Sequence, residues 1–136
     1  ALKQEIRFVL QEESQLNEIV RLVGMDALGA RDRLTMETAK SIREDYLHQN
    51  AFHEVDTYTS LDKQYRMMKL ILGFYHAGTE ALDAGVELSA LLDLPVREQI
   101  GRSKYIEEQH IDRFEEIQRN IKKEINALVS TGETNV

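Results

Sequence analysis

The stretch LDKQYRMMKLILGFYHAGTEALDAG (Leu61 to Gly85) carries the strongest secondary-structure signal in the sequence. Thr59 or Ser60 can cap the start of a helix here, and Gly85 marks its end. Its apolar residues recur at steps of three, four and seven, as expected for one face of an α-helix: Leu61, Tyr65, Met68, Leu72, Tyr75 and Leu82. A helix of this length with one apolar side predicts a bundle, because the stripe has to be covered by other elements.

Two more helices are predicted on the N-terminal side of this stretch. Gly24 ends the first one, because a residue without a Cβ enters a left-handed cap without strain. The first helix has its apolar stripe at Leu2, Ile6, Val9, Leu16, Val20 and Val23, widened by Leu10 and Ile19. The second begins near Ala30 to Asp32 and carries Leu34, Thr38, Ala39, Ile42 and Tyr46 on one side. Only about six residues separate the two patterns, so they predict a helix–turn–helix with its tip near Leu28.

The C-terminal part is also helical by pattern. A short turn is expected near Leu88 to Leu92, and Pro95 suits the first turn of the next helix, which Gly101 can bend or end. A last helix, roughly Glu107 to Val129, turns these residues inward: Ile111, Phe114, Ile121, Ile125 and Leu128. No strand pattern occurs. The fold class is therefore all-α, a helical bundle of about five to six helices, with one domain over 1–130 and a disordered tail over 131–136.

Composition narrows the class of protein further. The chain has 136 residues, no Cys and a formal charge of −7, which argues against nucleic acid as a partner. The lack of Cys excludes disulfides and leans towards a reducing compartment. No apolar run approaches the roughly 20 residues that cross a bilayer, so no direct membrane insertion is expected.

Motifs for catalysis and metal binding are weak. No phosphate-binding glycine motif occurs, and without Cys there is no thiol nucleophile. His48, His53 and Asp56 could ligate a metal, but a solvated loop commonly holds the same residues. A di-iron centre would use two Glu-x-x-His pairs and two more glutamates. Glu107 with His110 is a full match to this pair, and Asp45 with His48 is a loose one. Glu13 is the only further carboxylate that the inward stripes offer. We expect no catalytic residue and no metal ligand in this chain.

Three features remain that plain helix packing does not demand. They are the corner Val23 to Leu34, the loop His48 to Ser60 with its Phe52, and the segment Asp93 to Tyr105. A plain connection, an aromatic anchor for a long loop and a solvated face would explain them equally well. Taken alone, the residues indicate a helical interaction module, such as a free-standing adaptor.

Four segments together resemble one family, and the similarity runs from about Leu2 to Leu128 in the family's order. They are LQEESQLNEIVRLVGMDAL (10–28), REDYLHQNAFHEVDTY (43–58), KQYRMMKLILGFYHAG (63–78) and LPVREQIGRSKY (94–105). The chain resembles the C-terminal helical domain of the catalytic A subunit of archaeal and vacuolar-type rotary ATP synthases. LHQNAF, KQYRMMK and LPVRE are the most specific parts of this resemblance.

The resemblance implies a part in ion-coupled ATP synthesis or hydrolysis, with H⁺ and Na⁺ both open as the coupling ion. It implies that ATP/ADP with Mg²⁺ is handled by the intact subunit, whose preceding nucleotide-binding domain supplies the groups that contact the phosphates. The implied partners are that domain, the B subunit of the hexameric head and the D subunit of the central stalk. The implied location is cytoplasmic and peripheral to the membrane, and the chain alone would be inactive.

The resemblance also assigns two sites. Phe52 is similar in position to an aromatic wall of the adenine pocket. The corner is similar in position to the acidic DELSEED lever of the related bacterial and mitochondrial beta subunit. This implies a rotor contact at Met25, Asp26, Ala27, Leu28 and Gly29.

The corner departs from that acidic motif in its charge. Asp26 and Asp32 are offset by Arg31 and Arg33, so an acid–base latch is not expected. We expect a steric and apolar contact instead. It would use Met25, Ala27 and Leu28, with Gly24 and Gly29 setting the turn.

Overall fold

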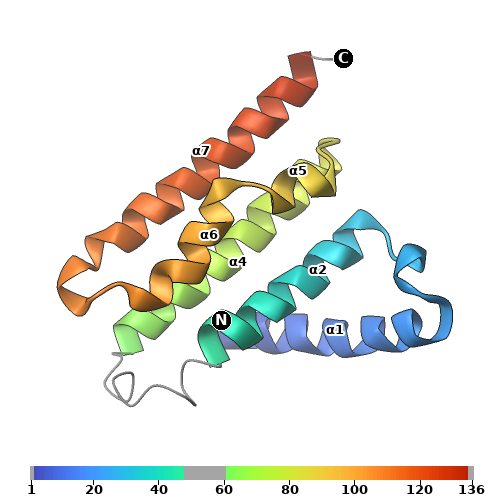
Figure 1. The fold of residues 1–136 in the computed structure, drawn as a ribbon, viewed down its shortest axis with the longest axis horizontal. Helices are drawn as coiled ribbons and strands as arrows, with labels where there is room; N and C mark the ends of the chain where they lie inside the picture. Colours follow the sequence, from blue (N-terminus) through green and yellow to red (C-terminus); the bar gives the residue numbers. More distant parts are fainter. Residues whose placement is uncertain (1, 48–60, 135–136) are drawn as a thin grey trace.

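The computed structural model describes residues 2–47 and 61–134. Six α-helices and no strand occur in these ranges (Figure 1), which confirms the predicted all-α bundle. The helices are α1 (Leu2–Val23), α2 (Ala30–Ser41), α4 (Leu61–Asp83), α5 (Leu88–Leu92), α6 (Pro95–Arg102) and α7 (Asp112–Thr134).

Short helical turns join several of these elements. A 3₁₀ turn, η1 (Met25–Ala27), lies between α1 and α2, and a π-helical segment, η2 (Ile42–Leu47), follows α2. Two more 3₁₀ turns, η4 (Ser103–Tyr105) and η5 (Glu108–His110), lie between α6 and α7. The 3₁₀ turns lie where the chain changes direction, whereas η2 continues directly from α2.

Helix α4 lies at the centre of the bundle. It packs most extensively against α7 and α2 and also contacts α1 and α6 (Figure 1). Its buried residues form a wider arc than the predicted stripe: Met67, Met68, Leu70, Ile71, Leu72, Phe74 and Ala81. Tyr65, predicted to face inward, is exposed. The single-stripe prediction was wrong here, because neighbours cover α4 from more than one side.

Helix α1 confirms the first half of its predicted stripe. Ile6, Val9 and Leu16 are buried, whereas Ile19 and Val23, nearer its end, are exposed. The ends of α1 and α2 that lead into their connection are drawn apart in Figure 1. The apolar period of α1 therefore continues past the part of the helix that the bundle covers.

The C-terminal third differs from the prediction mainly in its boundaries. Pro95 lies in the first turn of α6 as expected, and Gly101 lies inside that helix. The last helix begins at Asp112 rather than near Glu107 and continues through Thr134. Residues 131–134 are thus helical, despite Gly132, rather than part of the predicted disordered tail, and the Thr131 hydroxyl donates to the Ala127 carbonyl at 2.8 Å.

Polar side chains tie the N-terminal hairpin to the rest of the bundle. The Thr35 and Tyr75 hydroxyls lie 3.0 Å apart, joining α2 to α4, and Arg97 Nη2 of α6 lies 3.2 Å from Glu37 Oε2 of α2.

A second ion pair lies inside the hairpin. The buried Glu13 carboxylate of α1 accepts a hydrogen bond from Arg43 of η2. This bond and the neighbouring carboxylates raise the pKa of Arg43 above its usual value, against the opposing effect of burial. A buried carboxylate is costly without a partner, so the pair fixes α1 against η2.

Leu34 provides a test of how firmly the hairpin is attached. It is almost fully buried on α2 and approaches Gly78 of α4 closely, since a Cβ built on Gly78 would lie 3.1 Å from its Cδ2. Leu34→Ala is expected to lower the free energy of unfolding by about 2–5 kcal/mol, because a cavity would remain between α2 and α4. Urea denaturation measures this. Lys40→Ala, on the exposed side of the same helix, is the control and should change it by less than about 0.5 kcal/mol.

Candidate functional site

The connection between α1 and α2, residues 24–29, forms a sharp elbow at the edge of the molecule (Figure 1). Gly24 opens it with φ 92° and ψ 165°, a backbone region that is essentially restricted to glycine. The predicted need for glycine at position 24 is confirmed, although ψ is extended rather than left-handed helical. Gly29 has φ −73° and ψ 172°, an ordinary extended conformation, so of the two predicted hinge glycines only Gly24 is required by its backbone.

Leu28 departs from the expectation of an apolar side chain at the exposed tip. Its side chain is only 6% exposed. After η1 the chain turns Leu28 away from solvent, and its backbone N–H donates to the Met25 carbonyl at 3.1 Å. Leu28 therefore supports the elbow from within, and its side chain is not available for a surface contact.

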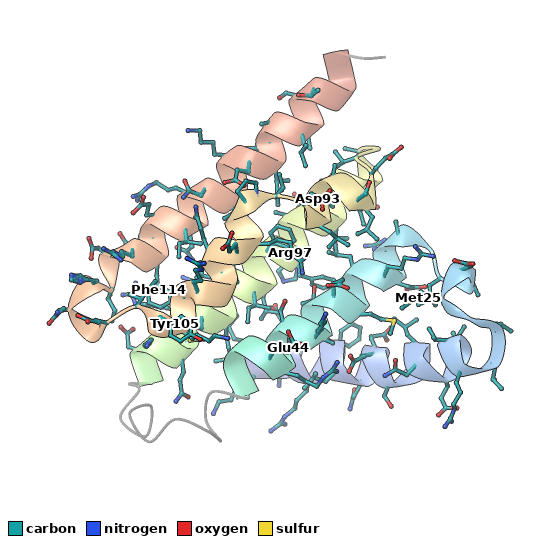
Figure 2. The ribbon with its side chains drawn as sticks, in the orientation of Figure 1. Met25, Glu44, Asp93, Arg97, Tyr105 and Phe114 are labelled. Carbon is teal, nitrogen blue, oxygen red and sulfur yellow. The ribbon has the colours of Figure 1, made fainter. Side chains whose placement is uncertain are left out.

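The other four residues predicted for the rotor contact lie at the surface. Met25, Asp26, Ala27 and Gly29 are all exposed, and Figure 2 labels Met25 at the elbow. The Arg33 guanidinium reaches back from α2, with Nη2 3.3 Å from the Met25 carbonyl and 3.4 Å from Asp26 Oδ1. This contact offsets the charge of Asp26, as the alternating signs in the sequence suggested, and holds η1 against α2.

An apolar surface adjoins the elbow, and we call it the elbow patch: Ile19, Leu22, Val23 and Met25. Their exposed fractions are 42%, 80%, 67% and 46%, respectively. The first three are spaced three and four apart, so they share one face of the last turns of α1. Clustered exposed apolar side chains mark interaction sites more often than scattered ones do. The sequence did not reveal this patch, because the helical period assigned Ile19 and Val23 to the buried stripe.

The segment Asp93 to Tyr105 has a structural role that its sequence did not reveal. Val96 and Ile100 are the buried residues of α6, and Arg97 of the same helix forms the ion pair with Glu37. The Glu124 carboxylate of α7 accepts a hydrogen bond from the Val96 backbone N–H at 3.0 Å. Since helix N-termini leave N–H groups without intrahelical partners, Glu124 caps α6 from a different helix. Figure 2 labels Asp93, Arg97 and Tyr105 along this segment.

Phe52 and the candidate ligands His48, His53 and Asp56 lie outside the described residues. The role of Phe52 in an adenine pocket therefore stays a prediction. The buried Lys63, near the start of α4, donates from Nζ to the Lys104 carbonyl at 2.8 Å. This bond joins the beginning of α4 to η4.

The di-iron alternative has little support in the part of the chain that can be placed. The Glu13 carboxylate, the only supporting glutamate, already accepts a hydrogen bond from Arg43. Glu107 lies at the surface before η5 rather than facing the bundle core. Among the side chains that the structure describes, no group of three or more His, Asp or Glu is placed to hold a metal ion. Within residues 2–47 and 61–134, every helix is too short or too polar to cross a membrane.

The fold and the elbow define a class of protein: an all-helical domain whose hairpin tip carries exposed apolar side chains. Comparison with known families is specific. Residues 1–92 match the family described as "C-terminal domain of V and A type ATP synthase". The chain belongs to this family.

Individual relatives extend the match to nearly the whole chain. It is 62% identical over 130 residues, 95% of its length, to the V-type ATP synthase alpha chain of Acetivibrio thermocellus. The proteins of the same name from Clostridium perfringens (strain SM101) and Thermoanaerobacter pseudethanolicus are 60% and 56% identical over 97% and 96% of the chain. The chain spans only 22% of the length of each of these relatives.

The two glycines of the elbow form a matched pair for a stability test. A Cβ on either would meet no atom within 4 Å, so backbone conformation alone distinguishes them. Gly24→Ala is expected to cost about 1–3 kcal/mol, because φ 92° is unfavourable for any residue with a Cβ. Gly29→Ala should change the stability by less than about 1 kcal/mol. Chemical denaturation of the two variants measures the difference, and equal losses would contradict the assigned role of Gly24.

Proposed function

We propose that this chain is the lever domain of the catalytic A subunit of a rotary ATP synthase. It converts the closing of a preceding nucleotide-binding domain into a push on the central stalk, and transmits the stalk's motion back during synthesis. The observation that carries this proposal is the elbow patch, an exposed apolar surface at the end of a helical hairpin. Membership of the ATP synthase family favours this function over a free-standing adaptor.

A lever has to move as one body. The hairpin is fixed to the central helix by the buried Leu34 and by the Thr35–Tyr75 hydrogen bond, and to α6 by the Arg97–Glu37 ion pair. Packed helices deform little, so a rotation applied to the bundle would reach the elbow without being absorbed inside the domain.

The chemistry of the elbow supports a steric and apolar contact with the D subunit of the central stalk. Asp26 is balanced by Arg33, which leaves little net charge for an ionic latch. The contacting surface would be the elbow patch together with Asp26, Ala27 and Gly29, while the buried Leu28 keeps the elbow from collapsing under load.

The remaining parts of the proposal concern the intact catalytic subunit. ATP/ADP with Mg²⁺ would bind in the nucleotide-binding domain next to the B subunit of the hexameric head, with Phe52 of this chain against the adenine. The chain alone, without phosphate-binding motifs in its sequence, would not hydrolyse ATP. The complex would translocate H⁺ or Na⁺, with the catalytic subunit cytoplasmic and peripheral to the membrane.

The proposal predicts different torques for variants of the apolar and of the acidic side chains of the elbow. Leu22→Asp with Val23→Asp in the intact enzyme should sharply reduce stall torque in single-molecule rotation. Charges placed in an apolar contact cost about 2 kcal/mol or more. Asp26→Ala with Asp32→Ala should leave the torque nearly unchanged, since exposed ion pairs contribute about 0–1 kcal/mol. Both pairs are exposed, so circular dichroism should show an intact fold for each variant. A large loss of torque in the Asp26→Ala, Asp32→Ala variant would contradict the apolar mechanism.

Phe52 provides a separate test in the intact catalytic subunit. Phe52→Ala is expected to raise the apparent nucleotide dissociation constant roughly tenfold, because stacking of an aromatic ring on a base contributes about 1–3 kcal/mol. Fluorescence titration with an ATP analogue measures it, and Phe52→Tyr, which keeps the aromatic face, should bind nearly as tightly as the parent. An unchanged constant in Phe52→Ala would remove the adenine-pocket assignment and leave the lever untouched.

A further inference from the structure

A groove between α4 and α7 is not used by the lever mechanism. It encloses about 510 Å³. The two helices lie side by side (Figure 1), and both line it. From α4 come Lys69, Gly73 and Ala77, and from α7 come Glu115, Gln118, Arg119, Ile121 and Lys122.

The rims of this groove are basic in an otherwise acidic chain. Lys69 lies on the α4 side and Arg119 and Lys122 on the α7 side, while Glu115 is the only acidic residue in its lining. The chain as a whole has a formal charge of −7, so this is a local reversal of sign. Neither Arg119 nor Lys122 forms an ion pair with any residue in the placed part of the chain, and Lys69 Nζ lies 5.6 Å from the centre of the exposed Tyr65 ring.

The floor of the groove is open and apolar. Gly73 and Ala77 are four apart, so they lie above one another on the same face of α4, with Ile121 opposite on α7. A Cβ built on Gly73 would meet no atom within 4 Å, so the space above this residue is empty. Glycine costs about 1 kcal/mol relative to alanine inside a helix, yet here the missing side chain keeps the floor low.

We infer that this groove binds an acidic amphipathic helix of another protein in the assembled complex. A channel between two parallel ridges admits a third helix by ridge-into-groove packing, with small residues allowing its backbone to come close. Cations on both rims complement carboxylates on both flanks of such a helix, while its apolar stripe covers Ala77 and Ile121. This goes beyond the lever function, because it concerns a different face, made by α4 and α7, and does not need the elbow.

Photo-crosslinking in the intact, assembled complex tests this inference directly. A benzoylphenylalanine residue in place of Gln118 should cross-link to one segment of another protein of the complex. Mass spectrometry should show Asp or Glu on both flanks of an apolar stripe with helical spacing in that segment. The same probe at Lys123, which is exposed on α7 outside the groove lining, should give no such product.

Two variants check the charge and the shape of the groove. Lys122→Glu should lower the cross-link yield from position 118 about fivefold, while Lys123→Glu, the same charge change one residue away, should leave it unchanged. Gly73→Leu should abolish the product by filling the floor. Its melting temperature should not fall, because leucine favours the helix and enters empty space.

The inference would be overturned by no cross-link from position 118, by a cross-link to a segment without acidic flanks, or by equal effects of Lys122→Glu and Lys123→Glu. Lys122-dependent sedimentation of the complex with phosphatidylglycerol vesicles, without a protein cross-link, would also overturn it, because it would assign the groove to an anionic membrane surface.

Discussion

The apolar arc of α4 has to be covered from more than one side, because a single neighbouring helix would leave part of it in water. Met67, Leu70 and Phe74 lie within this arc, and all are buried. Coverage by α7, α2 and α1 places the rest of the chain. Helix α2 is held against α4 through residues such as Leu34 and Thr35, and α1 reaches α4 through its N-terminal part, which leaves the last turns of α1 and the elbow residue Met25 exposed. One packing constraint thus produces both the stiffness of the domain and its exposed tip.

The helices could be predicted well from the sequence, because the spacing of apolar residues and the residues that begin or end a helix are local signals. Gly24 and Pro95 mark boundaries through backbone geometry that only a few residues satisfy. What the period does not encode is how far a neighbouring helix extends. Ile19 and Val23 continue the stripe of Ile6 and Val9 without interruption, yet only the earlier pair is covered. Sequence alone could not separate the two halves of that stripe.

The elbow shows the same limit at the level of single side chains. Five consecutive residues were predicted to contact the rotor, and four of them are exposed, but the bulky aliphatic one, Leu28, is turned inward. In so short a connection the backbone conformation changes from one residue to the next, so neighbouring side chains can point to opposite sides. Contacts such as Glu124 with Val96, made between residues far apart in the chain, gave no local signal at all. The charge balance was predictable, because Arg33 and Asp26 are close in the sequence as well as in space.

The elbow patch also affects the tendency of the isolated domain to self-associate in solution. Leu22 and Val23 present an apolar surface that the described residues of the domain leave exposed, so two copies that meet tip to tip would associate through it. The formal charge of −7 opposes such encounters at neutral pH by mutual repulsion. Acidification neutralises the carboxylates and added salt shortens the range of that repulsion, so colloidal stability depends on a long-range charge that has no part in holding the helices together.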